Sequence, residues 1–386
     1  MKMIKNARIL TGTGTEYENG VIVFDKKIRF VGKHYDGAVD DIIDGSGLVV
    51  TPGLIDAHSH MGLFGDALGF EGADANEDSD PITPHLRAID GINPQDRAFS
   101  DARRAGVTTV VTGPGSANPI GGQFAAIKTS GVCVDDMIIK APCAMKMALG
   151  ENPKTVYNDK SQTPTTRMGT LALIRETLFK AVNYRDDWEK YNSDPQEEDK
   201  PEFDMKLEAM LPVINREIPV KVHAHRADDI CSAIRLAKEF GFDVTIEHCS
   251  DGAIVSDILK RDNIDVNLGP TLTDRSKPEL KNLSFDTYAL LSNIGLSVSI
   301  ITDHPEITVE NLPLCAALAV SNGMNEADAL MAITHNAASN CRIDSRVGEL
   351  AVGKDADIAV FSAPPTAFDS KCVMTFIDGE CVFSSL

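Results

Sequence analysis

Apolar runs of β type alternate with amphipathic segments through the middle of the chain. The runs cover residues 106–113, 137–142, 220–225, 242–249, 264–270 and 296–303. Between them lie segments such as 227–241 and 286–295, in which apolar residues recur at the spacing of one helix face. Near-continuous apolar strands that alternate with helices predict a parallel sheet covered by helices. The number of such units favours a closed (β/α)8 barrel over a short open sheet.

The two ends of the chain have a different pattern. Residues 1–50 and 347–386 contain short runs of alternating apolar and polar residues, punctuated by glycine and aspartate, without a helical period. Such runs predict a small β-sandwich that both ends build together, because the ends of a barrel domain lie close to each other. We therefore expect an α/β fold with a composite β-sandwich domain at 1–50 and 347–386 and a (β/α)8 barrel at 51–346.

Composition restricts the function classes. The chain has 386 residues and a net charge of −20, which argues against nucleic acid and anionic membrane as partners. No apolar run reaches the roughly 20 residues of a membrane span, and the first residues do not resemble a secretory signal. None of the cysteines forms a CxxC pair, which argues against a zinc ribbon. We expect a cytoplasmic protein with a small-molecule substrate, and the sequence is compatible with a homo-oligomer.

Residue types that bind metals stand where several predicted strands end. His58 and His60 close one apolar run, and residues two apart on a strand point to the same side. His223, His248 and Asp303 each end another run. The carboxyl ends of barrel strands all face one mouth, so these side chains are expected to converge on a shared metal site. One strand-end histidine is common by chance, whereas this full set is not.

Several segments resemble motifs of the amidohydrolase superfamily. TPGLIDAHSH at 51–60 looks like the opening motif, and KVHAH, IEHC and TDHP are similar to the fifth-, sixth- and eighth-strand motifs. Residues 334–361 resemble the closing helix and the return to the small β domain. The resemblance spans nearly the whole chain. The nearest branch is the one that holds imidazolonepropionases and Xaa-Pro dipeptidases.

This resemblance implies a role for each strand-end residue. His58 and His60 would bind the more buried metal, and Asp303 would bind the same ion and accept a proton from the attacking water. His223 and His248 would bind a second ion. With one metal only, His248 would instead polarise the substrate carbonyl, so it is a candidate catalytic residue as well as a candidate ligand. The expected cofactor is a divalent metal, zinc above all, in one or two copies.

A bridging ligand separates the one-metal from the two-metal interpretation. Two-metal members of the superfamily often use a carboxylated lysine on the fourth barrel strand, and Lys146 in CAMKMALGE fits that position. A lysine must lose its proton to react with carbon dioxide, and burial lowers its pKa. Glu151 is the alternative, since some relatives bridge with a glutamate, and Lys140 is a weaker one. We favour Lys146 over Glu151.

Three further residues are candidates for substrate binding. Gln123 follows two glycines that permit close backbone approach, so its amide can reach a substrate. His225 and Arg226 follow His223, and an arginine there can pair with a substrate carboxylate. A structural role is an equal alternative for each of them. The loop 65–81 after the first barrel strand is either a lid over the site or a plain surface loop.

These observations predict a metal-dependent amidohydrolase, a hydrolase that cleaves a C–N bond in an amide, cyclic amide or peptide-like substrate through a metal-activated water. A metal-dependent deaminase on the same scaffold is the alternative, and a one-metal site without a modified lysine would favour it. A non-enzymatic scaffold protein is a third interpretation, which missing ligands would mark. The sequence does not identify the substrate.

Overall fold

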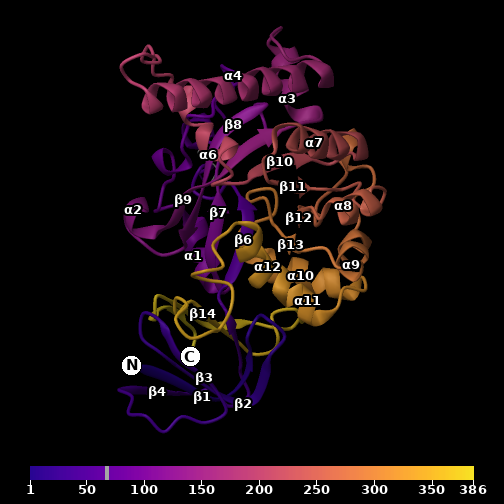
Figure 1. Cartoon of the computed structure of the whole chain (residues 1–386). Coiled ribbons are helices and arrows are strands. Elements are labelled where there is room, and N and C mark those ends of the chain that lie inside the picture. The colour runs from indigo at the N-terminus through magenta and orange to yellow at the C-terminus, as the bar shows by residue number, and fades with distance from the viewer. Residues whose placement is uncertain (66–68) are drawn as a thin grey trace.

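Two separate sheets organise the structure, a computed structural model that describes residues 1–65 and 69–386. Each sheet has eight strands. One forms a nearly closed barrel that helices surround, and the other lies beside it where the two chain termini meet (Figure 1). The predicted fold class is thereby confirmed, while the boundaries at 50/51 and 346/347 stay a prediction.

The barrel strands follow one another in chain order around the sheet: β6 (Leu54–Ser59), β7 (Val107–Thr112), β8 (Ile120–Lys128), β9 (Ile138–Ala148), β10 (Val220–Ala224), β11 (Val244–His248), β12 (Asp265–Leu268) and β13 (Val298–Ile300). Backbone hydrogen bonds between the end of β6 and the residues that follow β13 bring the two edges together. The Asp303 amide donates to the His58 carbonyl at 3.2 Å, and the His60 amide donates to the His304 carbonyl at 2.8 Å. The barrel therefore closes at the level of the predicted ligands.

One barrel strand departs from the predicted parallel arrangement. β8 runs antiparallel to both β7 and β9, whereas the other paired neighbours from β9 to β13, and β6 with β7, run parallel. Only residues 113–119 connect β7 to β8, fewer than the dozen or so that a parallel crossover needs. A short connection of this kind turns the chain back on itself, so the prediction of an all-parallel barrel is wrong at the third strand.

The second sheet joins both ends of the chain. Its strands are β1 (Lys2–Leu10), β2 (Glu16–Phe24), β3 (Ile28–Gly32), β4 (Asp41–Asp44), β5 (Val49–Pro52), β14 (Ile358–Phe361), β15 (Cys372–Ile377) and β16 (Glu380–Ser384). The link between the N-terminal and C-terminal strands is the antiparallel pairing of β5 with β14. Apolar side chains from both ends, such as Ile4, Phe24, Val360 and Phe376, form a core of its own for this sheet.

Helices cover the outer face of the barrel (Figure 1). The α-helices are α1 (Arg97–Arg104), α2 (Val134–Met137), α3 (Glu151–Asp159), α4 (Arg167–Ser193), α5 (Met205–Glu208), α6 (Leu211–Ile214), α7 (Ala227–Phe240), α8 (Ser256–Asp262), α9 (Asp286–Asn293), α10 (Leu312–Ser321), α11 (Glu326–Ala332) and α12 (His335–Asn340). The 3-10 helices are η1 (Gly69–Gly72), η2 (Ala88–Asp90), η3 (Pro278–Leu280) and η4 (Val309–Asn311). Among the described helices, none combines the length and apolar character of a membrane span.

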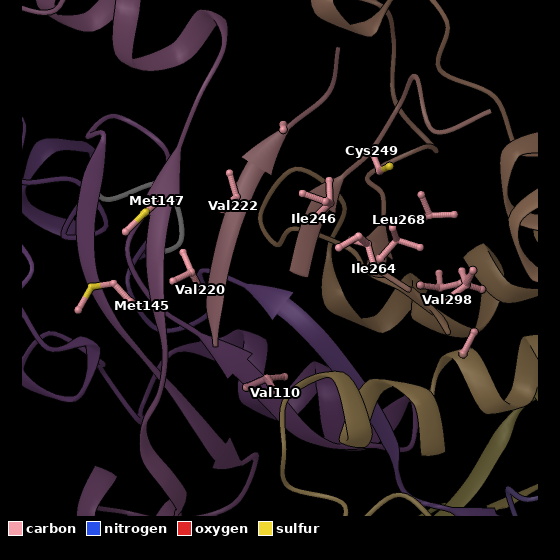
Figure 2. Close-up of a cluster of buried hydrophobic side chains, with 14 of the residues drawn as sticks. Val110, Met145, Met147, Val220, Val222, Ile246, Cys249, Ile264, Leu268 and Val298 are labelled. Atoms are coloured by element: carbon pink, nitrogen blue, oxygen red, sulfur yellow. The ribbon is translucent and has the colours of Figure 1, made fainter. Parts of the chain in front are cut away.

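Side-chain alternation divides the barrel strands into two faces. Val220 and Val222 stand opposite Met145 and Met147 in the β9–β10 register, and all four are buried in the hydrophobic cluster between the barrel and its helices (Figure 2). The residues between them point the other way, into the barrel. Alternation therefore directs Lys146 on β9, which pairs with residue 221 on β10, toward the interior.

A buried ionic cluster fastens the second sheet to the barrel. Lys128, the last residue of β8, is 3% exposed and lies 2.8 Å from carboxylate oxygens of both Asp355 and Asp357 and 3.0 Å from Asp378. Asp355 also contacts Arg346 at 2.7 Å. A lysine this deeply buried remains charged only because carboxylates surround it. The cluster thus depends on correct packing of both sheets.

Candidate metal centre

The predicted strand-end residues come together in two buried groups. His58, His60 and Asp303 form one, and within it the candidate ligand atoms lie within 4.8 Å of one another. A second group, with the same spacing, contains His223 and His248 as predicted. It also contains His225, for which the sequence suggested substrate binding. The groups are neighbours, since the ring centroids of His58 and His248 are 5.3 Å apart.

Backbone conformation aims two of these residues into the barrel. His248 has a φ of 73° and Asp303 a φ of 54°, both in the left-handed region that side chains other than glycine seldom adopt. On β11, Glu247 already faces the interior, so regular alternation would turn His248 outward. The left-handed turn at the strand end reverses that direction. Strain of this kind is found mainly at functional sites.

A polar network beneath the site fixes His58. Its Nδ1 lies 2.7 Å from Glu247 Oε2, and Glu247 also accepts hydrogen bonds from Lys221, Thr245 and Asn267. Burial acts to raise the pKa of Glu247, but the charge of Lys221 and the contact with His58 outweigh it and hold that pKa well below its usual range. An ionised carboxylate keeps the imidazole proton on Nδ1, which leaves Nε2 free for a metal.

Oxygen acceptors orient the other imidazoles in a similar way. His60 Nδ1 lies 2.7 Å from the Gly113 carbonyl, and His248 Nδ1 lies 2.7 Å from the Gly269 carbonyl. His225 Nδ1 is 2.8 Å from the Ser250 hydroxyl. In each ring one nitrogen is anchored and the other is left for the centre of the site, the arrangement usual for metal-binding histidines.

The donor atoms at the centre fit a divalent cation. Asp303 Oδ1 lies 3.4 Å from His58 Nε2 and 3.2 Å from His60 Nε2, close to the separation of neighbouring ligands around an ion with bonds of about 2.0–2.1 Å. Asp303 Oδ1 and His248 Nε2 are both buried without a hydrogen-bond partner in the described part of the chain. Buried acceptors that face one another repel unless a cation lies between them. These residues therefore fit a metal.

The electrostatics of the site favour the protonation states in which these side chains can bind a metal. Burial and the nearby Lys146 lower the pKa of His58 to about 3, and burial and His223 lower the pKa of His225 to about 3, so both rings are neutral. Burial acts to raise the pKa of Asp303, but its contact with His60 and the other nearby charges lower it to about 2. Neutral imidazoles and an ionised carboxylate are the states that bind zinc.

Lys146 lies at the edge of the first group. It is fully buried on β9, the fourth barrel strand, and its Nζ is 3.2 Å from His58 Nε2. Burial lowers its pKa to about 8, against the effect of Asp303, whose charge acts to raise it. Gly121 lies beside this side chain, and a Cβ there would stand 3.6 Å from Lys146 Cγ, an ordinary van der Waals distance. Gly122 permits a close backbone approach elsewhere, because a Cβ there would stand 2.6 Å from the Leu86 carbonyl oxygen.

Glu279 is a site residue that the sequence reasoning missed. It stands in η3, is 1% exposed, and places Oε1 3.4 Å from His223 Nε2 and 3.9 Å from His225 Nε2. Burial acts to raise its pKa, but the hydrogen bond and charge of His223 and the charge of His225 lower it to about 2. Its only signal in the sequence is its place after the seventh barrel strand, where loops face the barrel mouth.

The remaining candidates are spread over different places. Glu151 lines the cavity above the site, and its backbone amide donates to Glu279 at 3.1 Å. Gln123 lines another, smaller cavity and donates to the Pro84 carbonyl at 3.4 Å. Arg226 forms a bidentate ion pair with Asp228, two residues further on, and is outside the cavity lining. The structure therefore does not bring Gln123 or Arg226 to the site.

A cavity of about 740 Å³ opens above the two groups. Its lining includes His60, His223, His225 and Asp303 together with loop residues from around the barrel mouth. Such a volume is ample for a small-molecule ligand. The loop 65–81 contributes Asn76 to the lining, and its residues 66–68 lie outside the described part of the chain.

Comparisons with known proteins agree with this geometry. The chain is 29% identical over 375 residues to the amidohydrolase tasK of Hapsidospora irregularis, covering 89% of this chain but only 37% of that protein. It is 24% identical over 382 residues to an imidazolonepropionase of Fusobacterium nucleatum, covering 91% and 86% of the two chains. The crystal structure of an amidohydrolase from Thermotoga maritima superimposes with a TM-score of 0.96 at 41% identity, with all of both chains covered.

The family model described as "Amidohydrolase family" matches residues 49–382. This range contains every barrel strand and both groups of candidate ligands. The chain therefore belongs to the amidohydrolase family.

Proposed function

We propose that this protein hydrolyses a C–N bond of a small amide-like molecule with the help of two zinc ions. The observation that carries the proposal is the pair of adjacent buried ligand groups, in which Asp303 Oδ1 and His248 Nε2 have no hydrogen-bond partner among the described residues. The comparisons support the family. The reaction, the metal and the number of ions are our inference from the site.

We assign His58, His60 and Asp303 to one ion and His223 and His248 to the other. Lys146, carboxylated on Nζ, would bridge them, since its charge already acts on both His58 and His248. His225 completes the second group and is a candidate ligand of the same ion. Glu151 is less suited to the bridge, because the buried Glu279 lies between its backbone and His223.

Divalent ions in such sites supply a hydroxide nucleophile near neutral pH and polarise the carbonyl that it attacks. Asp303 is the general base in this scheme. Its carboxylate takes the proton of the attacking water and passes it to the nitrogen that leaves. If only the first ion is bound, His248 would polarise the carbonyl in place of the second. The barrel wall and the buried network beneath His58 keep these groups in fixed positions.

Metal removal and replacement test the proposal. The protein is depleted with a chelator, reloaded with zinc, and assayed with N-acyl amino acids, dipeptides and cyclic amides. We expect about two zinc ions per chain and hydrolysis only in the reloaded protein. Absence of bound transition metal, with no cleavage after zinc is added, would refute it. Ammonia release from an exocyclic amine at one ion per chain would point instead to a deaminase.

A further inference from the structure

One cationic side chain lines the cavity above the metal centre in the described part of the chain. Among residues 1–65 and 69–386, Lys277 is the only lysine or arginine in the lining. It stands just before η3, on the loop that follows β12. Arg226, the cation that the sequence suggested for this purpose, is paired with Asp228 and lies outside the lining. A negatively charged part of a ligand in this cavity would therefore meet Lys277.

Lys277 is available to a ligand. Within the described residues no carboxylate lies within ion-pair distance of its ammonium group, which donates a hydrogen bond to the Asn152 amide oxygen at 2.8 Å. Glu151 and Glu306 also line the cavity, yet neither pairs with it. An unpaired cation in a cavity can bind an anion without first losing another partner.

Asn152 connects this lysine to the second ligand group. Its Nδ2 lies 3.4 Å from His223 Nε2, so one amide group separates the ammonium of Lys277 from an imidazole of the site. The exposed ammonium of Lys277 is thus connected to the second ligand group through a single side-chain amide.

We propose that Lys277, held by Asn152, binds the carboxylate of the amine product, so that the substrates are N-acyl or N-aminoacyl α-amino acids. This inference rests on the proposed function. In such a substrate the carboxylate lies two bonds beyond the nitrogen of the bond to be cleaved, and the amide of Asn152 separates Lys277 from His223. The leaving product is then a free amino acid, which keeps its carboxylate on Lys277 until release.

Product binding tests the subsite without relying on turnover. Zinc-loaded protein is titrated by calorimetry with leucine, phenylalanine, methionine, arginine and aspartate, and with the α-carboxamide of each. We expect at least one free acid to bind about 10- to 100-fold more tightly than its carboxamide, the size of a hydrogen bond to a charged group. Lys277→Gln should reduce that preference to less than about threefold.

Lys281→Gln is the matched control. Lys281 is an exposed lysine of the same loop, but its side chain is not part of the cavity lining. Its replacement should leave the preference for the free acid over the carboxamide unchanged. Three results would overturn the proposal: equal binding of acid and carboxamide, an unchanged preference in Lys277→Gln, or no binding of any free acid. An unchanged preference would mean that a carboxylate contacts the metal directly. Zinc-dependent hydrolysis with any of these results would leave the proposed reaction standing and remove only the subsite.

Discussion

Lys146 is the residue at which a proton and a metal compete most directly. Its Nζ lies 3.2 Å from His58 Nε2, a nitrogen assigned to the first ion. An ammonium there would stand about 4 Å from a charge of +2, and Coulomb's law with an effective dielectric constant of about 20 gives a repulsion of about 8 kcal/mol. That energy corresponds to roughly a million-fold loss of metal affinity. A protonated lysine and a bound ion therefore exclude each other.

Removing the proton costs much less. Burial lowers the pKa of Lys146 to about 8, so at pH 7 the neutral amine lies only about 1.4 kcal/mol above the ammonium. As the pH rises toward about 8 the neutral form gains, and above that value it dominates. We expect the zinc affinity of the apoprotein to increase up to about pH 8 and then to level off.

Two substitutions separate charge from ligation. Lys146→Arg keeps a cation that cannot lose its proton, and it should bind neither ion at pH 7. Lys146→Met removes the charge at similar length, and it should keep the ion at His58, His60 and Asp303 while it loses the second one with the bridge. Bicarbonate or short carboxylates should partly restore the second ion in Lys146→Ala.

The measurement is zinc content after dialysis, together with zinc affinity by competition with a chromogenic chelator. Circular dichroism and thermal unfolding show whether each variant is folded. Normal zinc content in a folded Lys146→Arg protein would refute the electrostatic reasoning. Loss of one ion in Glu151→Gln, with both retained in Lys146→Met, would make Glu151 the bridge. A single ion in the wild type, unaffected by either change, would show a one-metal site.

Four further predictions concern the metal centre and the buried ionic cluster. Asp303→Asn should keep the fold and lower turnover by several orders of magnitude, because a ligand and a proton acceptor change together; near-normal kcat would contradict that role. Glu279→Gln should weaken the second ion about 10-fold or more, by loss of the carboxylate that faces His223, and equal zinc affinity in both proteins would exclude it. Lys128→Met should lower the free energy of unfolding by about 3–5 kcal/mol, measured by urea denaturation, because it leaves buried carboxylates unpaired. In the same cluster burial acts to raise the pKa of Asp355, but Lys128 and other cations lower it to about 2, so its contribution to stability is present above about pH 4 and is lost as the pH falls toward about 2. Asp355→Asn should flatten that part of the stability curve, and an unchanged slope would disprove the assignment.

The general architecture could be predicted because buried strands and helices produce a repeating pattern of apolar residues in the sequence. Strands that are buried on both faces read as apolar runs, and polar ligands interrupt them only at their ends, as at His223 and Asp303. The reversed direction of β8 produces no such pattern. Its apolar pattern is the same in either direction, and only the short connection 113–119 determines how it runs.

The site was predictable where its residues lie on strands or closely follow them, as His60 and Asp303 do. Lys146 was identified through its position on the fourth strand, and the structure places it beside His58. Loop residues were not predictable in the same way, since their side-chain directions follow no period. Glu279 was missed for this reason. Arg226 was proposed from its neighbourhood in sequence, but Asp228, two residues further on, holds its guanidinium away from the cavity.

The reversed strand has a consequence for the order in which the barrel assembles. β7, β8 and β9 form a meander whose neighbours are close in sequence, whereas β9 must pair with β10 across residues 149–219. Contacts between nearby residues form sooner than distant ones, because they close shorter loops. We therefore expect the meander to be in place first, with Lys146 already on it. The strands that carry His223 and His248 would dock later. The metal centre is therefore completed at a late stage of folding, when β10 pairs with β9.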